Sequence, residues 1–478
     1  MISYGNKKEK IDTIYYVDQL IEALCNGTGV KDFRYWVPEN DKSVAEAFLN
    51  ALTVENCPDR IVISGSIKET VDVDAVLEFA IKLLASGKCK KGMVLCLYGT
   101  NICDYGVKKL VAAICKYSEI KELTLDVQGN NITSVGAVEL ADAMRMYPAT
   151  LANVIIHDNN IGADGVKALA SLLQQGICKP DFEFSLGEID FEGKQDEVID
   201  ALLQALLSGN CPTGFVLDLR GVSLKQHTVL RFAETIKSGK LPDGFGLYMG
   251  PKLPFNDNKS EIGNDGANAF AEAIMSGHAP TNLSLSFHDS NIQEGMLTFA
   301  AAVKHENCPK GLCLFLPNSY YLNCGADRAF AASLMTSTSL VGLYLDGIGD
   351  SSESDGCNLL IRHCYLRNKL MHEYPEYAED IKKMCIEKRL FQSKYKIFDY
   401  WTKMQRWVIN ESEFPSPGLR DKLPEQLLSD LNYLNKLEKE MYLVRYDASR
   451  RGFFAGNHAS NKVTNFEEYT KHVIGKSV

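Results

Sequence analysis

Short apolar segments alternate with longer helical patterns along most of the chain. The central apolar residue of each short segment recurs at Leu97, Val127, Ile156, Leu186, Leu219, Met249, Phe287, Leu316 and Leu345. Around these anchor residues apolar and polar side chains alternate, which predicts strands. The segments between them carry apolar residues at helical spacing, which predicts amphipathic helices. A strand and a helix that recur about every 29 residues indicate a repeat protein.

The corner after each predicted strand is polar. Residues 127–132 read Val-Gln-Gly-Asn-Asn-Ile, and residues 156–161 read Ile-His-Asp-Asn-Asn-Ile, 29 residues later. A short polar residue stands three positions after the anchor at Thr100, Asn130, Asn159 and Ser290. Because a strand that turns into a helix exposes main-chain groups, we expect these side chains to satisfy them.

Glycine and cysteine recur at fixed places in the repeat. Glycine closes five of the predicted helices ten residues before an anchor, at Gly87, Gly176, Gly209, Gly239 and Gly277, where a left-handed residue is expected. A second glycine, nine residues after the anchor, is expected to open the helix at Gly106, Gly136, Gly165 and Gly325. Cysteine repeats at Cys57, Cys89, Cys178, Cys211 and Cys308, which predicts buried apolar thiols and no disulfide framework.

These residues carry a resemblance to a known family. The pattern Leu-x-Leu-x-x-Asn-x-Ile, followed by glycine and a full helix, resembles the ribonuclease-inhibitor type of leucine-rich repeat. The resemblance implies an α/β fold, a curved leucine-rich-repeat solenoid with a parallel sheet inside and helices outside. Helix ends such as residues 208–214, Ser-Gly-Asn-Cys-Pro-Thr-Gly, are also similar to leucine-rich-repeat effectors of intracellular bacteria. The acidic signals of some effectors are similar to residues 466–469, Phe-Glu-Glu-Tyr.

The same patterns predict three regions. Residues 1–56 are expected to form an N-terminal cap with one degenerate repeat, because an end repeat covers the open core of its neighbour. Residues 57–365 hold the leucine-rich repeats, and residues 366–478 predict an α-helical C-terminal domain with a Pro/Ser/Gly break at 415–418. The apolar row at 427–444 favours an intramolecular helix pair over a dimeric coiled coil, so we expect a monomer.

Charge limits the class of partner. The chain has 51 basic and 61 acidic residues, which argues against nucleic-acid binding. Residues 366–478 hold 20 basic and 16 acidic residues, leaving 31 and 45 in residues 1–365. The acidic repeats therefore favour a protein partner with a basic patch. Without a signal-like segment or 18 uninterrupted apolar residues, we expect no membrane insertion and a cytosolic protein, in the host cytoplasm if it is a secreted virulence effector.

Side chains that point away from the predicted core define the concave face. They include Tyr98, Gln128, His157, Asp158, Asp218, Arg220, Tyr248, His288, Asp289, Phe315, Tyr344 and Asp346. Aromatic and charged residues on a rigid concave surface favour recognition of a partner protein, although a solvated face without a partner is the alternative. We expect an interaction scaffold with no catalytic residue, metal or cofactor.

Two alternatives to an interaction scaffold involve chemistry. His157-Asp158 and His288-Asp289 lie four strands apart, which at ~4.8 Å per strand separates them by roughly 19 Å and excludes one shared site. The alternative function is an enzyme, for example ubiquitin-ligase-like by analogy with some bacterial effectors, with its active site in the C-terminal domain and the repeats as substrate recogniser. Its candidate residues are Cys385 and His372, although Cys385 falls in an apolar stripe.

Overall fold

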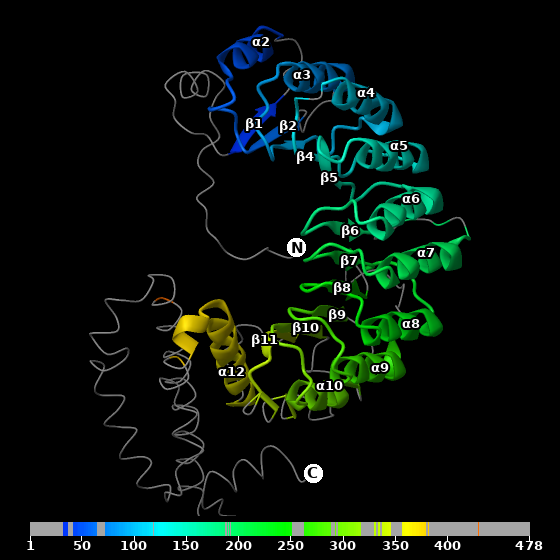
Figure 1. Ribbon diagram of the computed structural model, residues 1–478, viewed down its shortest axis with the longest axis vertical. Coiled ribbons are helices and arrows are strands. Elements are labelled where there is room, and N and C mark those ends of the chain that lie inside the picture. Colours follow the sequence, from blue (N-terminus) through cyan, green and yellow to red (C-terminus); the bar gives the residue numbers. More distant parts are fainter. Residues whose placement is uncertain are drawn as a thin grey trace, which may run out of the picture. The chain divides into compact units, whose positions relative to one another are not determined.

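The chain divides into two compact units. In the computed structural model, the residues described are 32–36, 42–64, 72–117, 119–186, 189, 191, 193–250, 262–287, 292, 295–316, 329–330, 333–334, 337–345, 356–378, 381 and 429. The first unit comprises residues 1–222 with 240–242, and the second comprises residues 223–239 with 243–478. Each unit is an α/β assembly of parallel strands and helices that alternate along the chain (Figure 1).

The first unit contains strands β1 to β7. Its strands are β1 (Asp32–Trp36), β2 (Arg60–Ser64), β3 (Val94–Cys96), β4 (Leu123–Asp126), β5 (Leu151–Ile155), β6 (Glu183–Ser185) and β7 (Val216–Asp218). Its helices are α2 (Lys42–Ala51), α3 (Val73–Ala85), α4 (Cys103–Lys116), α5 (Ser134–Met146), α6 (Gly162–Gln174) and α7 (Gln195–Leu207). Strands β1 to β5 form a sheet in chain order, and β6 pairs with β7.

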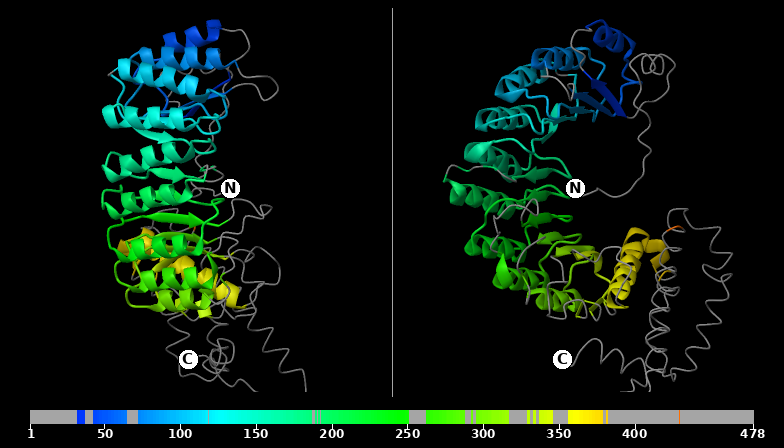
Figure 2. Two further views of the ribbon diagram at one scale, coloured as in Figure 1. Left: turned by 90° about the vertical axis from the view of Figure 1, so that its right-hand side faces the viewer. Right: turned by 180° about the vertical axis from the view of Figure 1, so that it is seen from behind.

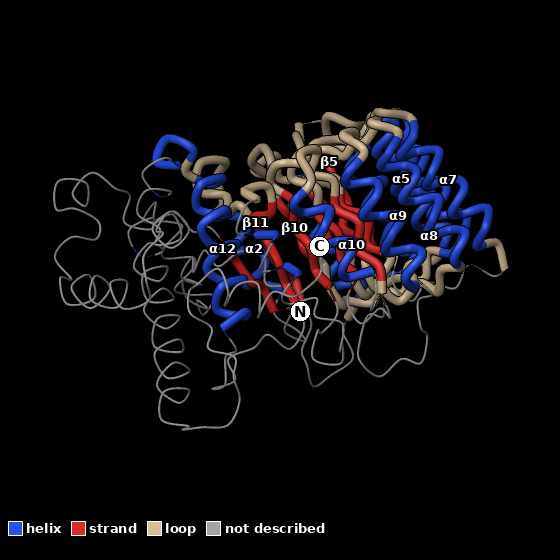
Figure 3. Tube along the Cα trace, turned by 90° about the horizontal axis from the view of Figure 1, so that it is seen from below, coloured by secondary structure: helices blue, strands red, loops and turns tan. Residues whose placement is uncertain are grey.

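The second unit follows the same plan. Its strands are β8 (Gly246–Met249), β9 (Ser284–Phe287), β10 (Leu312–Leu316) and β11 (Leu340–Leu345), which pair in chain order. Its helices are α8 (Gln226–Lys237), α9 (Gly263–Met275), α10 (Gly295–Lys304), α12 (Gly356–Glu373) and the 3-10 helix η2 (Pro375–Tyr377). Within this unit α8, α9 and α10 pack side by side along one face of the strands (Figures 2 and 3).

The sequence-based prediction of repeating strands and helices is confirmed. The anchors whose side chains are described, from Leu97 to Leu316, are buried with at most 4% of their surface exposed. Strand β1 and helix α2 lie within residues 1–56, the predicted N-terminal cap with one degenerate repeat. Residues 1–31 and the predicted C-terminal helical domain from residue 382 onward fall outside the described part of the chain, apart from residue 429.

Helix α12 completes the last described repeat. It spans Gly356–Glu373 and packs against β11, so it crosses the predicted domain boundary at residue 365. The Arg367 guanidinium is buried and donates to the main-chain oxygens of Leu334 and Ser337. The Asn368 amide donates to the oxygens of Ser337 and Leu340. These bonds satisfy the main-chain oxygen of Leu340, the first residue of β11, and two oxygens in the segment before it.

The polar corners join neighbouring repeats as expected. The Asn159 side-chain oxygen accepts the main-chain N–H groups of Asn130 and Ile132, each at 2.9 Å. Its amide nitrogen donates to the main-chain oxygens of Val127, Ile156 and His157. Asn130 makes the corresponding bonds to the repeat before it, including one of 2.7 Å to the oxygen of Leu97. One buried side chain therefore satisfies the backbone of two repeats.

The helix ends confirm one glycine prediction and add a serine cap. Gly87, Gly176, Gly209, Gly239 and Gly277 have φ between +66° and +80°, the left-handed conformation expected after a helix. The residue before glycine is serine in four of these copies, at Ser86, Ser208, Ser238 and Ser276. Each hydroxyl donates to the carbonyl three residues earlier, at 2.6 to 2.7 Å. These bonds satisfy carbonyls that the helix end leaves open.

The second glycine series lies at the helix starts, where it was predicted, and the structure adds a packing reason for it. Gly106, Gly136, Gly165 and Gly266 lie inside the first turns of their helices. A Cβ on Gly165 would lie 2.7 Å from the Cβ of Ala137 in the preceding helix. On Gly295 a Cβ would lie 2.3 Å from the Cβ of Ala267. At Gly165 and Gly295 glycine is therefore required because adjacent helices approach each other closely at the helix start.

This close approach gives a double-mutant test in the second unit. Gly295→Ala should lower the free energy of unfolding by about 1–3 kcal/mol through overpacking, although alanine is the better helix former by about 1 kcal/mol. Ala267→Gly removes the Cβ that the new methyl group would meet. In that background Gly295→Ala should be neutral or stabilising, as measured by urea-induced unfolding. Additive effects of the two changes would contradict the contact.

Candidate functional site

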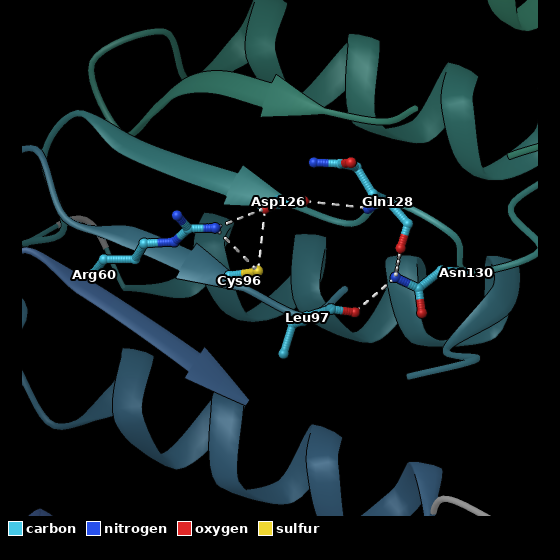
Figure 4. A network of polar contacts seen from close by, with 6 residues as sticks. All are labelled: Arg60, Cys96, Leu97, Asp126, Gln128 and Asn130. Carbon is cyan, nitrogen blue, oxygen red and sulfur yellow. Dashed lines mark hydrogen bonds and ion pairs between the residues drawn. The ribbon is translucent and has the colours of Figure 1, made fainter. Parts of the chain in front are cut away.

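The candidate site is the side of the strands that faces away from helices α3 to α7 in the first unit and α8 to α10 in the second. We call this side the helix-free face. Alternation places the odd positions Leu95, Leu97 and Leu125 in the buried core. The even positions Cys96, Asp126 and Gln128 therefore lie on the helix-free face, in front of the helices in the close view (Figure 4).

Three predicted residues of the first unit form one row. Tyr98, Gln128 and His157 each follow an anchor at the end of β3, β4 and β5. Main-chain hydrogen bonds join the neighbouring repeats along this row. Gly99 N donates to Gln128 O over 2.9 Å, and Gly129 N donates to His157 O over 3.0 Å. Tyr98 is 57% exposed. At the strand spacing of ~4.8 Å, the three side chains are neighbours across the sheet.

The ends of this row differ in their surroundings. The Tyr98 ring lies over Gly129, where an added Cβ would be 3.5 Å from its Cε2 atom. His157 is half-buried, and its Nε2 atom is enclosed with no hydrogen-bond partner within the described residues. Asp158, next to it, is exposed and has a left-handed φ of +54°. The structure thus brings Tyr98, Gln128 and His157 together, with Asp158 at the corner beyond them.

A second cluster of the first unit lies beside this row (Figure 4). The Cys96 thiol donates to Asp126 Oδ2 over 3.1 Å, and Arg60 Nη2 lies 3.6 Å from the same oxygen and 3.8 Å from the sulfur. The main-chain N–H of Gln128 donates to Asp126 Oδ1 at 3.3 Å. Burial and the Asp126 charge raise the pKa of the Cys96 thiol, so the thiol stays neutral at pH 7.

The predicted pair Asp218 and Arg220 also binds within the first unit. Asp218 is 4% exposed, and Arg220 Nε donates to its Oδ1 at 2.9 Å while Nη2 contacts Oδ2. The carboxylate also accepts the main-chain N–H of Arg220. A buried carboxylate needs such partners because an unpaired charge is costly to desolvate. The Asp218 carboxylate is therefore shielded from solvent, and Arg220 is the more exposed member of the pair.

In the second unit the helix-free face is aromatic. The Tyr248 and Phe315 rings meet edge to face, with centroids 6.2 Å apart and planes at 68°. They lean across β9, where Ser284 Oγ donates to the Tyr248 hydroxyl at 3.4 Å and Ser286 is buried. Tyr344 pairs with Phe315 in the strand register, but its side chain is not described. His288, Asp289 and Asp346 lie outside the described residues.

Some of the residues considered for chemistry lie in the described part. There, no group of three or more histidine, cysteine, aspartate or glutamate side chains is arranged to hold a metal ion. His372 lies in α12, whereas Cys385 is outside the described residues, so the pair proposed for an enzyme is not seen together. None of the described helices is long and apolar enough to span a membrane.

Sequence reasoning missed Arg60 as a site residue. It stands at the start of β2, two residues before Val62, in phase with the side chains of the helix-free face. The alternation of Arg60, Ile61, Val62 and Ile63 carries that signal, because Ile61 and Ile63 are fully buried. Its contact with Asp126 spans β3, and such a contact between non-adjacent strands depends on strand register, which the alternation does not give.

The comparisons with known proteins leave the chain without a family. No protein-family model matches it. No curated protein is significantly similar to it in sequence. The parallel strands and the alternating helices stand on the structure alone.

The repeated cysteines are packing residues, as predicted. Burial raises the pKa of the Cys89, Cys178, Cys211 and Cys308 thiols from 9.0 to about 12. The described cysteines, including these four, are free thiols. Because a neutral thiol is a poor nucleophile, these groups are unreactive at pH 7.

The raised thiol pKa predicts a pH dependence of stability. Above pH 9 an unfolded thiol loses its proton while the folded one keeps it until about pH 12, so unfolding is favoured as pH rises through this window. Each thiol should contribute a loss of about 1.4 kcal/mol per pH unit there. Urea unfolding of Cys178→Ala and wild type should therefore converge between pH 8 and pH 10.5.

The control for this prediction removes an apolar side chain that does not titrate. Met146 is 63% exposed, and the difference in unfolding free energy between Met146→Ala and wild type should stay constant over the same pH range. A Cys178→Ala difference that is equally constant would contradict the assignment of the pH dependence to the buried thiol.

Proposed function

We propose that this protein is a non-enzymatic interaction scaffold that binds a partner protein on the helix-free face. The observation that carries the proposal is Tyr98, a large aromatic side chain that is 57% exposed on a strand held by main-chain bonds to its neighbour. Tyrosine supplies wide contact area at low entropic cost and is enriched among the residues that dominate interface energies.

The surroundings of Tyr98 support a recognition role. Gln128 and His157 continue its row, and their main-chain oxygens are fixed by the corner asparagines at 3.0 Å. A rigid row of mixed apolar and polar side chains suits a partner because little ordering entropy is lost on binding. In the second unit the Tyr248 and Phe315 pair offers a separate aromatic surface on the helix-free side of its own strands.

The proposed repeat type, protein class and partner charge are inferred from the sequence. We infer a leucine-rich repeat of the ribonuclease-inhibitor type from the Leu-x-Leu-x-x-Asn-x-Ile pattern and the buried asparagines at its corners. The helix ends at 208–214 and the acidic segment at 466–469 support a secreted bacterial effector that acts on a host protein. The 45 acidic and 31 basic residues of 1–365 support a partner whose contact surface is basic overall.

Two tyrosines of the first unit allow a matched test. Tyr98 on the helix-free face is 57% exposed, and Tyr105 on helix α4 is 56% exposed. Affinity capture from eukaryotic lysate, followed by quantitative mass spectrometry, should identify a partner that Tyr98→Ala loses by about tenfold or more, the effect of removing an interface anchor. Tyr105→Ala should retain the same partner.

The results for these variants distinguish between the possible binding surfaces. Tyr248→Ala, measured in parallel, reports whether the aromatic surface of the second unit contributes to the same partner. Partners retained by both Tyr98→Ala and Tyr248→Ala would exclude the helix-free face. Equal losses of the partner with Tyr98→Ala and Tyr105→Ala would mean that exposed tyrosines contribute non-specific binding. Thermal unfolding of each variant confirms that the fold is intact.

A further inference from the structure

The arginines of the helix-free face differ in how many of their donors are used. Asp126 and Asp218 occupy the same position of the repeat, one residue before the anchor, and are 2% and 4% exposed. Each buried carboxylate contacts one arginine of the first unit, Arg60 or Arg220. What these two positions present to solvent is therefore guanidinium and not carboxylate.

Arg220 uses the side-on pair of its donors on Asp218. Its Nε and Nη2 atoms both donate to Asp218, one to each carboxylate oxygen, and its side chain is 25% exposed. This side-on arrangement uses the two parallel N–H groups of the guanidinium that best fit a carboxylate. A carboxylate that approached this same pair of donors would have to displace Asp218, and that displacement would weaken the pairing of a buried charge.

Arg60 is held by one corner only (Figure 4). Its Nη2 atom lies 3.6 Å from Asp126 Oδ2 and 3.8 Å from Cys96 Sγ, and its side chain is 48% exposed. Within the described residues its Nε and Nη1 atoms have no partner. Asp126 also accepts from the Cys96 thiol and the Gln128 main chain, so this carboxylate does not depend on Arg60 alone. The guanidinium is thus oriented while several of its five donors remain open.

We propose that Arg60 binds a carboxylate of an acidic segment of the partner protein. The inference rests on the proposed function and adds one contact opposite in sign to the overall charge of the repeats. A parallel pair of N–H groups, one from Nη1 or Nε and one from the second hydrogen of Nη2, matches one carboxylate. The ion pair with Asp126 restricts the guanidinium in advance, which lowers the entropic cost of binding. Tyr98 and Gln128 lie just beyond the ends of β3 and β4, each two residues after a residue that Arg60 contacts, Cys96 and Asp126.

The local charge favours a carboxylate over a phosphate group. Arg60 and Asp126 together are neutral, so a singly charged group meets little net field, whereas a phosphate carries nearly two charges and generally needs several cations. The exposed acid of the neighbouring row, Asp158, follows β5 and lies three strands from β2, roughly 14 Å away at the usual strand spacing. It is therefore too distant to repel an anion bound at Arg60 at physiological ionic strength.

The test uses the full chain and three pools of nine-residue peptides with degenerate flanks. The central residue is glutamate, glutamine or phosphoserine, and binding is measured by biolayer interferometry. The glutamate pool should bind about tenfold more tightly than the glutamine pool, a ratio typical of hydrogen bonds to charged groups. Raising the salt concentration from 50 to about 300 mM should reduce that ratio.

The variants compare the two arginines directly. Arg60→Lys keeps the charge beside Asp126 but loses the planar fork, and it should abolish most of the preference for glutamate with little change in thermal unfolding. Arg220→Lys makes the same change beside Asp218 and should leave the preference intact. Arg60→Gln should remove the preference fully, provided that its circular dichroism matches that of the wild type.

Three results would overturn this inference. They are equal binding of the glutamate and glutamine pools, an unchanged glutamate preference in Arg60→Lys, and tighter binding of the phosphoserine pool than of the glutamate pool. A lysate partner that is lost in Tyr98→Ala but retained in Arg60→Lys would refute the Arg60 contact alone. The proposed function itself fails only when the partner is retained by the tyrosine variants, so the two failures are distinguishable.

Discussion

The described repeats depend on one constraint, which is that each corner exposes main-chain groups that the repeat cannot satisfy by itself. Asn159 meets the N–H groups of Asn130 and Ile132 from one side and the oxygen of Val127 from the other. Its own strand supplies the oxygens of Ile156 and His157. Without the neighbouring repeat these buried groups would lose their hydrogen-bond partners, which would cost about 1–3 kcal/mol each. Repeats of this kind are stable only as a stack.

The same bonds determine where function can be placed. The amides of Asn130 and Asn159 hold the main-chain oxygens of Gln128 and His157, and these are the residues that continue the row from Tyr98. The helix-free face is therefore rigid because of the buried corner and not because of its own side chains. Side chains in this row are free to vary while the backbone beneath them stays fixed, and this separation suits a recognition surface.

Much of the fold follows from residues that repeat in the sequence. The anchors, the corner asparagines and the helix-closing glycines are local signals, because burial, main-chain satisfaction and a positive φ each demand a residue type at one position. The role of Gly295 was not predictable in this way, since its cause is the Cβ of Ala267 in another helix. The same limit applies to Asp104, which accepts the N–H groups of Thr133 and Gly136 at the start of the next helix.

The candidate site was predictable in part for the same reason. Alternation alone places Tyr98, Gln128 and Arg220 on the helix-free face, but it gives no information on which carboxylates are solvent-exposed. A count of charged residues includes Asp126 as if its negative charge were exposed. In the structure Asp126 is buried and contacts Cys96 and Arg60. A buried charge needs partners, and the partners are what a ligand meets. What a surface presents to a ligand thus depends on which of its charges are buried and not only on their number, and at this position the exposed group is the Arg60 guanidinium.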